Sequence, residues 1–167
     1  MNTVNKPFDN FCKNMKLVIA DVDGVLTDGG MYYSKAGEEL KKFNTRDGMA
    51  VELLRKNQVN VILMSKENSK IVLQRGKKIQ AKKSYIGIKN KEEKLIEICK
   101  KFKVSLKGIA YLGDDINDLE IMKKVGFSAS PNNAINQVKR KSHFICKSNG
   151  GEGVLREVAE LILSIKK

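Results

Sequence analysis

Two aspartates that lie one residue apart, Asp21 and Asp23, directly follow the apolar run L-V-I-A at residues 17–20. Such a run predicts a buried parallel strand, and the Asp and Gly residues after it mark the end of that strand. In open α/β sheets, ligands bind beyond the carboxyl ends of the strands. Two carboxylates at such a place suit a Mg²⁺ site, or a nucleophile beside a proton donor. A turn with capping aspartates is the alternative, so this pair alone does not decide the function.

Polar side chains also follow two later apolar runs. Ser65 follows the run at residues 59–64, and Asp114, Asp115 and Asp118 follow the run at residues 108–112. Lys91, between these two runs, begins a predicted helix. Because carboxyl ends of parallel strands meet at one edge, we expect these groups to converge there. A divalent cation would relieve the repulsion among the carboxylates, and ligands that are all oxygen favour Mg²⁺ over Zn²⁺. With a hydroxyl and a lysine to bind a phosphoryl group, the set predicts a phosphoryl-transfer site.

The rest of the chain alternates between strand and helix patterns, which predicts an α/β fold with a doubly wound parallel sheet. A β-hairpin with arms at 31–33 and 39–43 is expected after the first strand. Asp47 is expected to cap the helix that follows. The other strands are expected at 59–64, 83–86, 108–112, 126–129 and 143–146, and the helices at 48–56, 69–78, 91–103, 118–125, 134–141 and 153–165.

The composition predicts one folded domain, at residues 16–167, and residues 1–15 are expected to be a loosely held N-terminal extension. The chain has 167 residues, of which 41% are apolar, and this is enough for a single full core. No apolar run approaches the roughly 18 residues of a membrane span, so we expect no association with a membrane. The three cysteines show no C-x-x-C spacing, which predicts reduced thiols and a place in the cytoplasm.

The net charge of +13 raises the question of nucleic-acid binding. The basic residues are 27 Lys and 5 Arg, spread along the chain without a concentrated arm. Proteins that read bases or phosphates rely on Arg, and proteins that bind single strands need aromatic stacking platforms. With 6% aromatic residues and no Trp, the chain is expected to bind no nucleic acid. Its lysines are expected to serve solubility and to attract anionic substrates.

Taken together, these residues resemble the haloacid dehalogenase phosphatases over residues 16–166. D-V-D-G-V-L-T-D is similar to the first motif of that family, Ser65 to the second, Lys91 to the third and G-D-D-I-N-D to the fourth. The resemblance implies that Asp21 attacks phosphorus and forms an aspartyl-phosphate. It also implies that Asp23 protonates the leaving alcohol and then activates water. Mg²⁺ would be bound by Asp21, the backbone carbonyl of Asp23, and Asp114.

Three more residues take supporting roles by the same resemblance. Asp115 and Asp118 would support the metal shell and the lysine, and Thr27 would assist near Asp23. The chain departs from the family in its second motif, where Ser65-Lys66 stands in place of the usual Thr-Gly. The hydroxyl is retained there, so the departure concerns the shape of the loop and not the chemistry.

Within that superfamily the chain resembles the capless phosphatases of 3-deoxy-2-ulosonate phosphates. The segments that carry this likeness are D-G-G-M-Y-Y, E-L-K-K-F-N-T-R-D-G, Y-L-G-D-D-I-N-D and G-G-E-G-V-L-R-E. It implies a small sugar phosphate as substrate and a homotetramer in which a neighbouring subunit covers the site in place of a cap. The likeness extends to the C-terminal domain of some CMP-sialic acid synthetases, so a non-catalytic tetramerisation module is a second hypothesis. The intact pair of Asp21 and Asp23 argues against that module.

Substrate choice within this group depends on few positions. Members that act on 3-deoxy-manno-octulosonate (KDO) 8-phosphate typically carry Arg in the second motif and G-G-R-G near the C-terminus, where this chain has Glu67 and Glu152. Together with Lys78, these residues favour a nine-carbon 9-phosphate of KDN or sialic acid over KDO 8-phosphate, which is the alternative. Arg46 and Arg156 are further candidates for substrate binding. Arg156 can instead pair with Glu160, four residues later on one helix.

Overall fold

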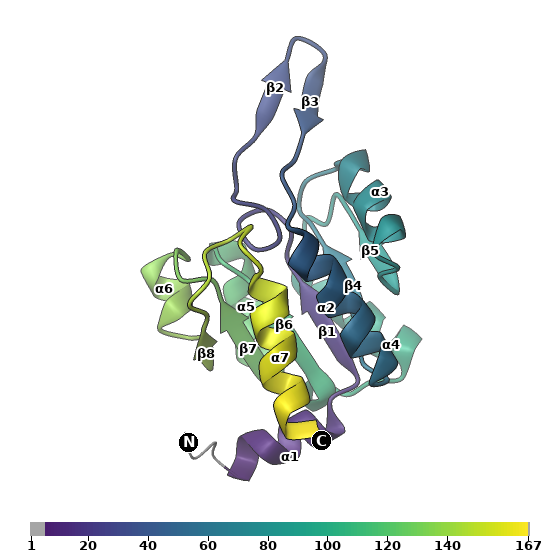
Figure 1. Ribbon diagram of the computed structural model, residues 1–167, viewed down its shortest axis with the longest axis vertical. Coiled ribbons are helices and arrows are strands. Elements are labelled where there is room, and N and C mark those ends of the chain that lie inside the picture. The colour runs from purple at the N-terminus through teal and green to yellow at the C-terminus, as the bar shows by residue number, and fades with distance from the viewer. Residues whose placement is uncertain (1–5, 167) are drawn as a thin grey trace.

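Six short strands form one parallel sheet at the centre of the molecule (Figure 1). The structure is a computed structural model that describes residues 6–166. Every neighbouring pair of strands in this sheet is parallel, which confirms the predicted fold class. From one edge to the other, the strands are β5 (Lys83–Tyr85), β4 (Asn60–Met64), β1 (Leu17–Ala20), β6 (Ile109–Leu112), β7 (Phe127–Ser130) and β8 (Phe144–Ile145).

Helices cover both faces of the sheet, so its central strands are buried on both sides. Successive residues of β1 point to opposite faces: Val18 and Ala20 belong to one core cluster, and Leu17 and Ile19 to the other. The first cluster includes side chains of α1 (Lys6–Asn14), α2 (Thr45–Lys56), α3 (Lys70–Lys78) and α7 (Val154–Lys166). The second includes side chains of α4 (Lys91–Phe102), α5 (Leu119–Lys124) and α6 (Asn136–Lys139).

A β-hairpin stands out from this body, as Figure 1 shows. Its arms are β2 (Tyr32–Ser34) and β3 (Gly37–Leu40), which pair antiparallel as a separate two-stranded sheet. The chain between β1 and α2 forms this hairpin and its connections, and no cap domain is inserted there. Two 3₁₀ turns, at Leu106–Gly108 and Ile116–Asp118, precede β6 and α5. Among the described residues, no helix is both long and apolar enough to cross a bilayer.

The N-terminal segment is more closely packed than the sequence suggests. Cys12 and Met15 are fully buried in the core, and α1 packs against α7. The expectation of a loosely held extension is therefore wrong for this part of residues 1–15, while residues 1–5 lie outside the described residues. The reason is visible in the sequence, because Phe11, Cys12 and Met15 recur at the i, i+1 and i+4 spacing that places apolar residues on one face of a helix.

The predicted cap of α2 is also wrong. The helix begins three residues earlier than expected, and its cap is Asn44, whose side chain accepts a hydrogen bond of 2.9 Å from the amide of Arg46. Asp47 is buried instead against the first turn of α7, where its Oδ1 accepts a hydrogen bond of 3.0 Å from the amide of Arg156. It thus supplies a cap for α7 from a different helix. Burial raises the pKa of this Asp47 carboxyl to about 6.

Candidate active site

The predicted site residues lie at the carboxyl ends of three adjacent strands. Asp21 follows β1, and its amide donates a hydrogen bond of 2.9 Å to the carbonyl of Leu112 at the end of β6. Ser65 follows β4, and its amide donates one of 2.9 Å to the carbonyl of Tyr85 at the end of β5. Because the strands end at the same level, the side chains after them share one edge of the sheet, as expected from the sequence.

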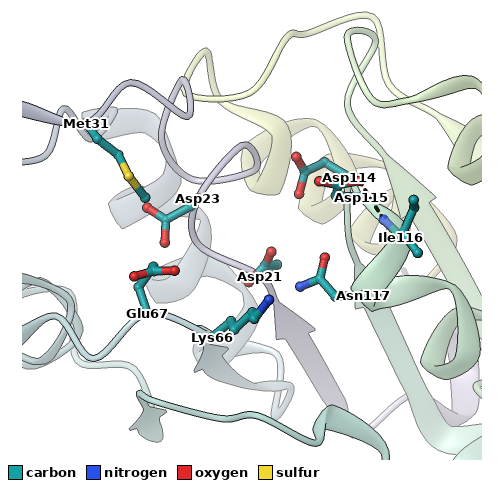
Figure 2. A pocket seen from close by; sticks show the side chains of 9 residues that line it. All are labelled: Asp21, Asp23, Met31, Lys66, Glu67, Asp114, Asp115, Ile116 and Asn117. Carbon is teal, nitrogen blue, oxygen red and sulfur yellow. Dashed lines mark hydrogen bonds between the residues drawn. The ribbon is translucent and has the colours of Figure 1, made fainter.

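A pocket of about 460 Å³ opens at this edge (Figure 2). At its base, carboxylate oxygens of Asp21, Asp114 and Asp118 lie within 4.8 Å of one another. The expected convergence of the acidic groups from β1 and β6 is therefore confirmed. The residues that line the pocket are Asp21, Asp23, Met31, Lys66, Glu67, Asp114, Asp115, Ile116 and Asn117.

Lys91 and Asp118 form the buried support beneath the pocket. The Nζ atom of Lys91 lies 3.0 Å from Asp21 Oδ1 and 2.7 Å from Asp118 Oδ1. Asp118 also accepts a hydrogen bond of 2.6 Å from the Tyr111 hydroxyl, and its Oδ2 accepts one of 3.0 Å from the amide of Asp114. With both oxygens of Asp118 already occupied, we infer that this residue orients Lys91 and the loop and does not itself bind a ligand.

Like charges held together in a dry place alter the acidity of these groups. Burial, and then the charge of Asp118, raise the pKa of Asp21 to about 8. Burial and the charges of Asp118 and Asp115 raise the pKa of Asp114 to about 7. Burial alone would lower the pKa of Lys91, but the charges of Asp21 and Asp118 outweigh burial and raise it. The ionised forms of Asp21 and Asp114 are therefore unfavourable here, and a bound cation would stabilise them.

The residues at this edge fit a magnesium ion. Asp114 Oδ1 is buried and has no hydrogen-bond partner, which is costly for a carboxylate unless a cation binds it. Space for this side chain exists only because residue 24 is a glycine, whose added Cβ would lie 2.0 Å from Asp114 Oδ2. The available ligand atoms are all oxygens, the set that Mg²⁺ prefers.

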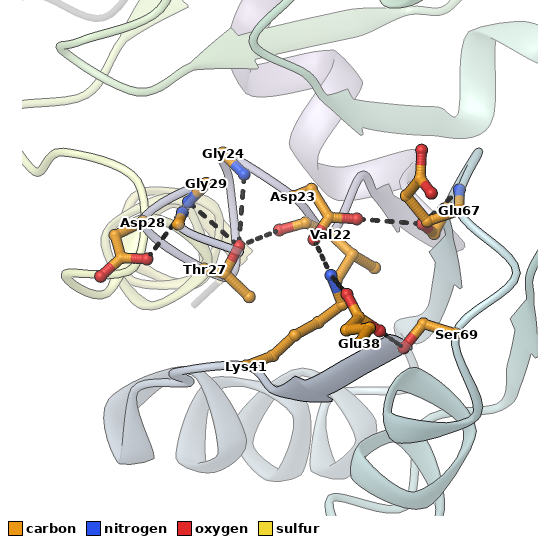
Figure 3. Close-up of polar contacts among 12 residues, drawn as sticks. Val22, Asp23, Gly24, Thr27, Asp28, Gly29, Glu38, Lys41, Glu67 and Ser69 are labelled. Atoms are coloured by element: carbon orange, nitrogen blue, oxygen red, sulfur yellow. Dashed lines mark hydrogen bonds and ion pairs between the residues drawn. The ribbon is translucent and has the colours of Figure 1, made fainter. Parts of the chain in front are cut away.

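Asp23 lies across the pocket from Asp114 (Figure 2), among hydrogen-bonding groups (Figure 3). Its Oδ2 accepts a hydrogen bond of 3.2 Å from the hydroxyl of Ser65, a fully buried residue. Its Oδ1 lies 2.6 Å from Nζ of Lys41. Thr27, expected to assist near Asp23, is buried beneath the loop that carries Asp23, and its Oγ1 accepts hydrogen bonds from the amides of Gly24 and Gly29 in that loop.

The loop that carries Asp23 is closed from outside by the segment before α7. The amide of Gly151 donates a hydrogen bond of 3.0 Å to the carbonyl of Val25. A Cβ atom at Gly150 would lie 2.0 Å from the carbonyl oxygen of Gly24, so no larger residue fits there. Asp115, the last of the predicted supporting residues, caps the turn at Ile116 through its Oδ1 at 2.7 Å and is exposed at the pocket wall.

The predicted substrate-binding residues do not all meet in one pocket. Glu67 lines the pocket of the aspartates. Arg46, Glu152 and Arg156 line a second hollow of about 330 Å³, where Arg156 Nε also pairs with Glu160 at 2.6 Å. Lys78 lines a third hollow between α2 and α3.

Sequence reasoning missed Lys41, Tyr111 and Gly24 as parts of the site. Lys41 is one of two adjacent lysines beside a hairpin, and lysine side chains are usually exposed, so its residue type alone predicts a surface position. Tyr111 is one apolar-looking residue of a buried strand, and nothing in the sequence shows that its hydroxyl meets Asp118. Gly24 offered a usable signal, because a glycine directly after paired aspartates often marks a close approach of another chain segment.

The chain is similar to known phosphatases in sequence and in structure. Residues 58–158 match the model of the haloacid dehalogenase-like hydrolase family. The 3-deoxy-D-manno-octulosonate 8-phosphate phosphatase of Yersinia pestis is 34% identical over 150 residues, covering 90% of this chain and 80% of that protein. A crystal structure of the Yersinia pestis phosphatase superposes with a TM-score of 0.93 at 32% identity, covering 98% of this chain and 88% of that one. The Moraxella catarrhalis phosphatase, in complex with a magnesium ion, a phosphate ion and KDO, gives a TM-score of 0.90 at 33% identity, covering 95% and 91% of the two chains.

Proposed function

The chain belongs to the haloacid dehalogenase-like hydrolases and is a phosphoric monoester hydrolase. From this membership we propose that it removes phosphate from a 3-deoxy-2-keto sugar acid with the aid of Mg²⁺. One observation supports the catalytic part most strongly. Asp21, Asp114 and Lys91 meet at the carboxyl edge of the sheet, with an unpartnered oxygen of Asp114 among them. A non-catalytic tetramerisation module would gain nothing from burying these charges.

In the proposed reaction, Asp21 forms a bond to phosphorus while the bond from phosphorus to the alcohol oxygen breaks. Asp23 gives its proton to that oxygen. Asp23 then takes a proton from water as the water oxygen attacks the aspartyl-phosphate, which releases phosphate and restores both aspartates. Ser65 and Lys91 stabilise the phosphoryl oxygens by hydrogen bonding and by positive charge.

Asp21, Asp114 and the backbone carbonyl of Asp23 are the proposed magnesium ligands. The bound ion would neutralise negative charge on the nucleophile and on the phosphoryl group, which otherwise repel each other. Asp115 and Asp118 support this arrangement through the turn at 116–118 and through Lys91.

We propose KDO 8-phosphate as the first substrate to test. The relatives that are 34% identical over nine-tenths of the chain are named as phosphatases of that compound. This reverses the preference for a nine-carbon substrate drawn from Glu67, Lys78 and Glu152. The nine-carbon substrates remain the second candidate because Glu67 lines the pocket of the aspartates, where a carboxylate can accept hydrogen bonds from a longer polyhydroxyl tail.

A phosphate-release assay on three compounds tests this choice. With Mg²⁺ present, we expect KDO 8-phosphate to give the highest kcat/KM, at least about tenfold above KDN 9-phosphate and N-acetylneuraminate 9-phosphate, because one extra contact is worth that much discrimination. A preference for either nine-carbon compound would restore the interpretation based on Glu67. No turnover of all three would contradict the proposed substrate class, although hydrolysis of another phosphate monoester would leave the catalytic site in place.

We further propose a homotetramer in which a neighbouring subunit covers the pocket. Apolar side chains lie exposed on the hairpin, with Tyr33 and Leu40 each 62% exposed, and such surfaces usually mark an interaction site. A neighbour would also explain why Arg46 and Lys78 line hollows apart from the aspartates. Without it the pocket opens directly to water, which weakens electrostatic stabilisation.

Light scattering tests this assembly. We expect a mass about four times that of one 18.7 kDa chain, and we expect Tyr33→Ser to lower both the mass and the turnover, because the hairpin contact then loses apolar area. Ile96→Ser is the matched control, since Ile96 is also exposed but lies on α4. A fully active monomer would rule out the covering subunit.

A further inference from the structure

Two adjacent lysines after the hairpin have opposite surroundings. The side chain of Lys41 is 0% exposed and its Nζ lies 2.6 Å from Asp23 Oδ1 and 2.5 Å from Glu38 Oε1. The side chain of Lys42 is 68% exposed and lies 3.5 Å from Asp28, also at the surface. A fully buried ammonium is costly, so its presence beside Asp23 calls for a reason beyond solubility.

Lys41 is itself fixed in place by a second carboxylate. Glu38, on β3, uses Oε1 for Lys41 and accepts a hydrogen bond at Oε2 from the hydroxyl of Ser69, a buried residue just before α3. Figure 3 shows this row of contacts from Ser69 through Glu38 and Lys41 to Asp23. The Lys41 ammonium is therefore directed at one oxygen of Asp23 and has little freedom to leave it.

We propose that Lys41 is a positioning residue that reserves Oδ2 of Asp23 as the oxygen that exchanges a proton with the substrate. This inference rests on the proposed phosphatase function. An ammonium donates hydrogen bonds only, so it can bind Oδ1 when Asp23 is a carboxylate and also, more weakly, when Oδ1 is the carbonyl oxygen of the acid. A proton on Oδ1 would face the ammonium, and the proton of the acid form is therefore placed on Oδ2.

The partner of Oδ2 supports this assignment. Oδ2 faces the Ser65 hydroxyl at 3.2 Å, and in the proposed reaction this hydroxyl turns to a phosphoryl oxygen. Oδ2 is then free to give its proton to the ester oxygen as the bond to phosphorus breaks. In the second step the same atom receives a proton from the attacking water. Lys41 gains and loses no proton in either step and touches neither the phosphorus nor the alcohol.

The test compares two substrates whose leaving groups differ in their need for a proton. Lys41→Met keeps most of the length of the side chain but removes the donor, so Oδ1 of Asp23 loses the partner that holds it in place. We expect kcat/KM for the best sugar-acid phosphate to fall about 100-fold, because a misplaced acid loses most of its effect. For p-nitrophenyl phosphate, whose phenolate leaves without a proton, we expect a fall of less than about fivefold.

Lys42→Met is the matched control, and both substrates should stay within about twofold of the wild-type values. Glu38→Gln provides a second variant, with a smaller loss of the same kind, because Lys41 then loses its ionic partner. Circular dichroism checks that each variant is folded.

If Lys41→Met lowers kcat/KM equally for both substrates, the assignment of Lys41 is overturned. It is also overturned if Lys42→Met lowers kcat/KM as much as Lys41→Met does. A wild-type protein that hydrolyses none of the sugar-acid phosphates would instead contradict the proposed substrate. In that case glycerol phosphate serves as the alkyl ester in the comparison with p-nitrophenyl phosphate.

Discussion

Asp21→Asn is expected to reduce phosphate release at least about 10⁴-fold, because an amide oxygen cannot form the covalent bond to phosphorus that the reaction requires. The fold should not suffer. The pKa of Asp21 is raised from its usual 3.8 to about 8, so its contribution to stability is present at low pH and lost as the pH rises through about 8. Above that pH and without metal, the variant should melt no lower than the wild-type protein.

Asp28→Asn provides the matched control for this experiment. It makes the same change in the same loop, but Asp28 is exposed and contacts Lys42 and the amide of Gly30. Its turnover should stay within about twofold of the wild-type value. Phosphate release measured beside thermal melting separates lost chemistry from lost structure. Turnover retained in Asp21→Asn would remove this residue as the nucleophile.

Chelation of Mg²⁺ is expected to abolish turnover, and its return should stabilise the folded protein. At a free concentration 100 times the dissociation constant, binding adds about 2.7 kcal/mol to the free energy of unfolding. The effect should grow between pH 6 and pH 9. With pKa values raised to about 7 for Asp114 and about 8 for Asp21, protons compete with the metal at the lower pH. Addition of Mg²⁺ near pH 7 should therefore release protons into a weakly buffered solution.

Two variants locate the metal in this experiment. Asp114→Ala should remove both the thermal shift and the proton release, because it deletes the carboxylate whose Oδ1 lacks a partner. Asp28→Ala removes an exposed carboxylate that does not line the pocket and pairs with Lys42, and it should keep the shift. A shift of equal size in wild-type protein and Asp114→Ala, or one that does not vary with pH, would place Mg²⁺ elsewhere on the chain.

The order of elements could be predicted from the sequence because strands buried on both faces appear as short continuous apolar runs. The run L-V-I-A is apolar on both faces and ends abruptly at Asp21, and β4 and β6 end in the same way at Ser65 and Gly113. Since function in such sheets gathers at the strand ends, the same signal also located the convergence of Asp21 with Asp114. Fold and pocket were therefore predictable from one pattern.

Local detail failed where two residues of similar chemistry compete for one position. Asn44 and Asp47 are both good capping residues, and only the packing of α2 against α7 shows which helix each one caps. Lys41 and Lys42 likewise differ only in the face of the chain on which they lie. Arg46 and Lys78 line hollows apart from the aspartates in this chain, and the sequence could not show this separation because resemblance to a family gives no distances.

Asp47 and Gly151 have a consequence for how the chain matures during its synthesis. The first turn of α7 depends on a carboxylate 109 residues earlier in the chain, and the loop that carries Asp23 is closed by a backbone contact from residue 151. When only the first 140 residues have emerged from the ribosome, the nascent chain already contains Asp21, Lys91 and Asp114. It still lacks Gly151, whose amide binds the loop that carries Asp23. The catalytic groups are thus made early and assembled late, so that an unfinished chain carries the reactive residues without the enclosure that would make them active.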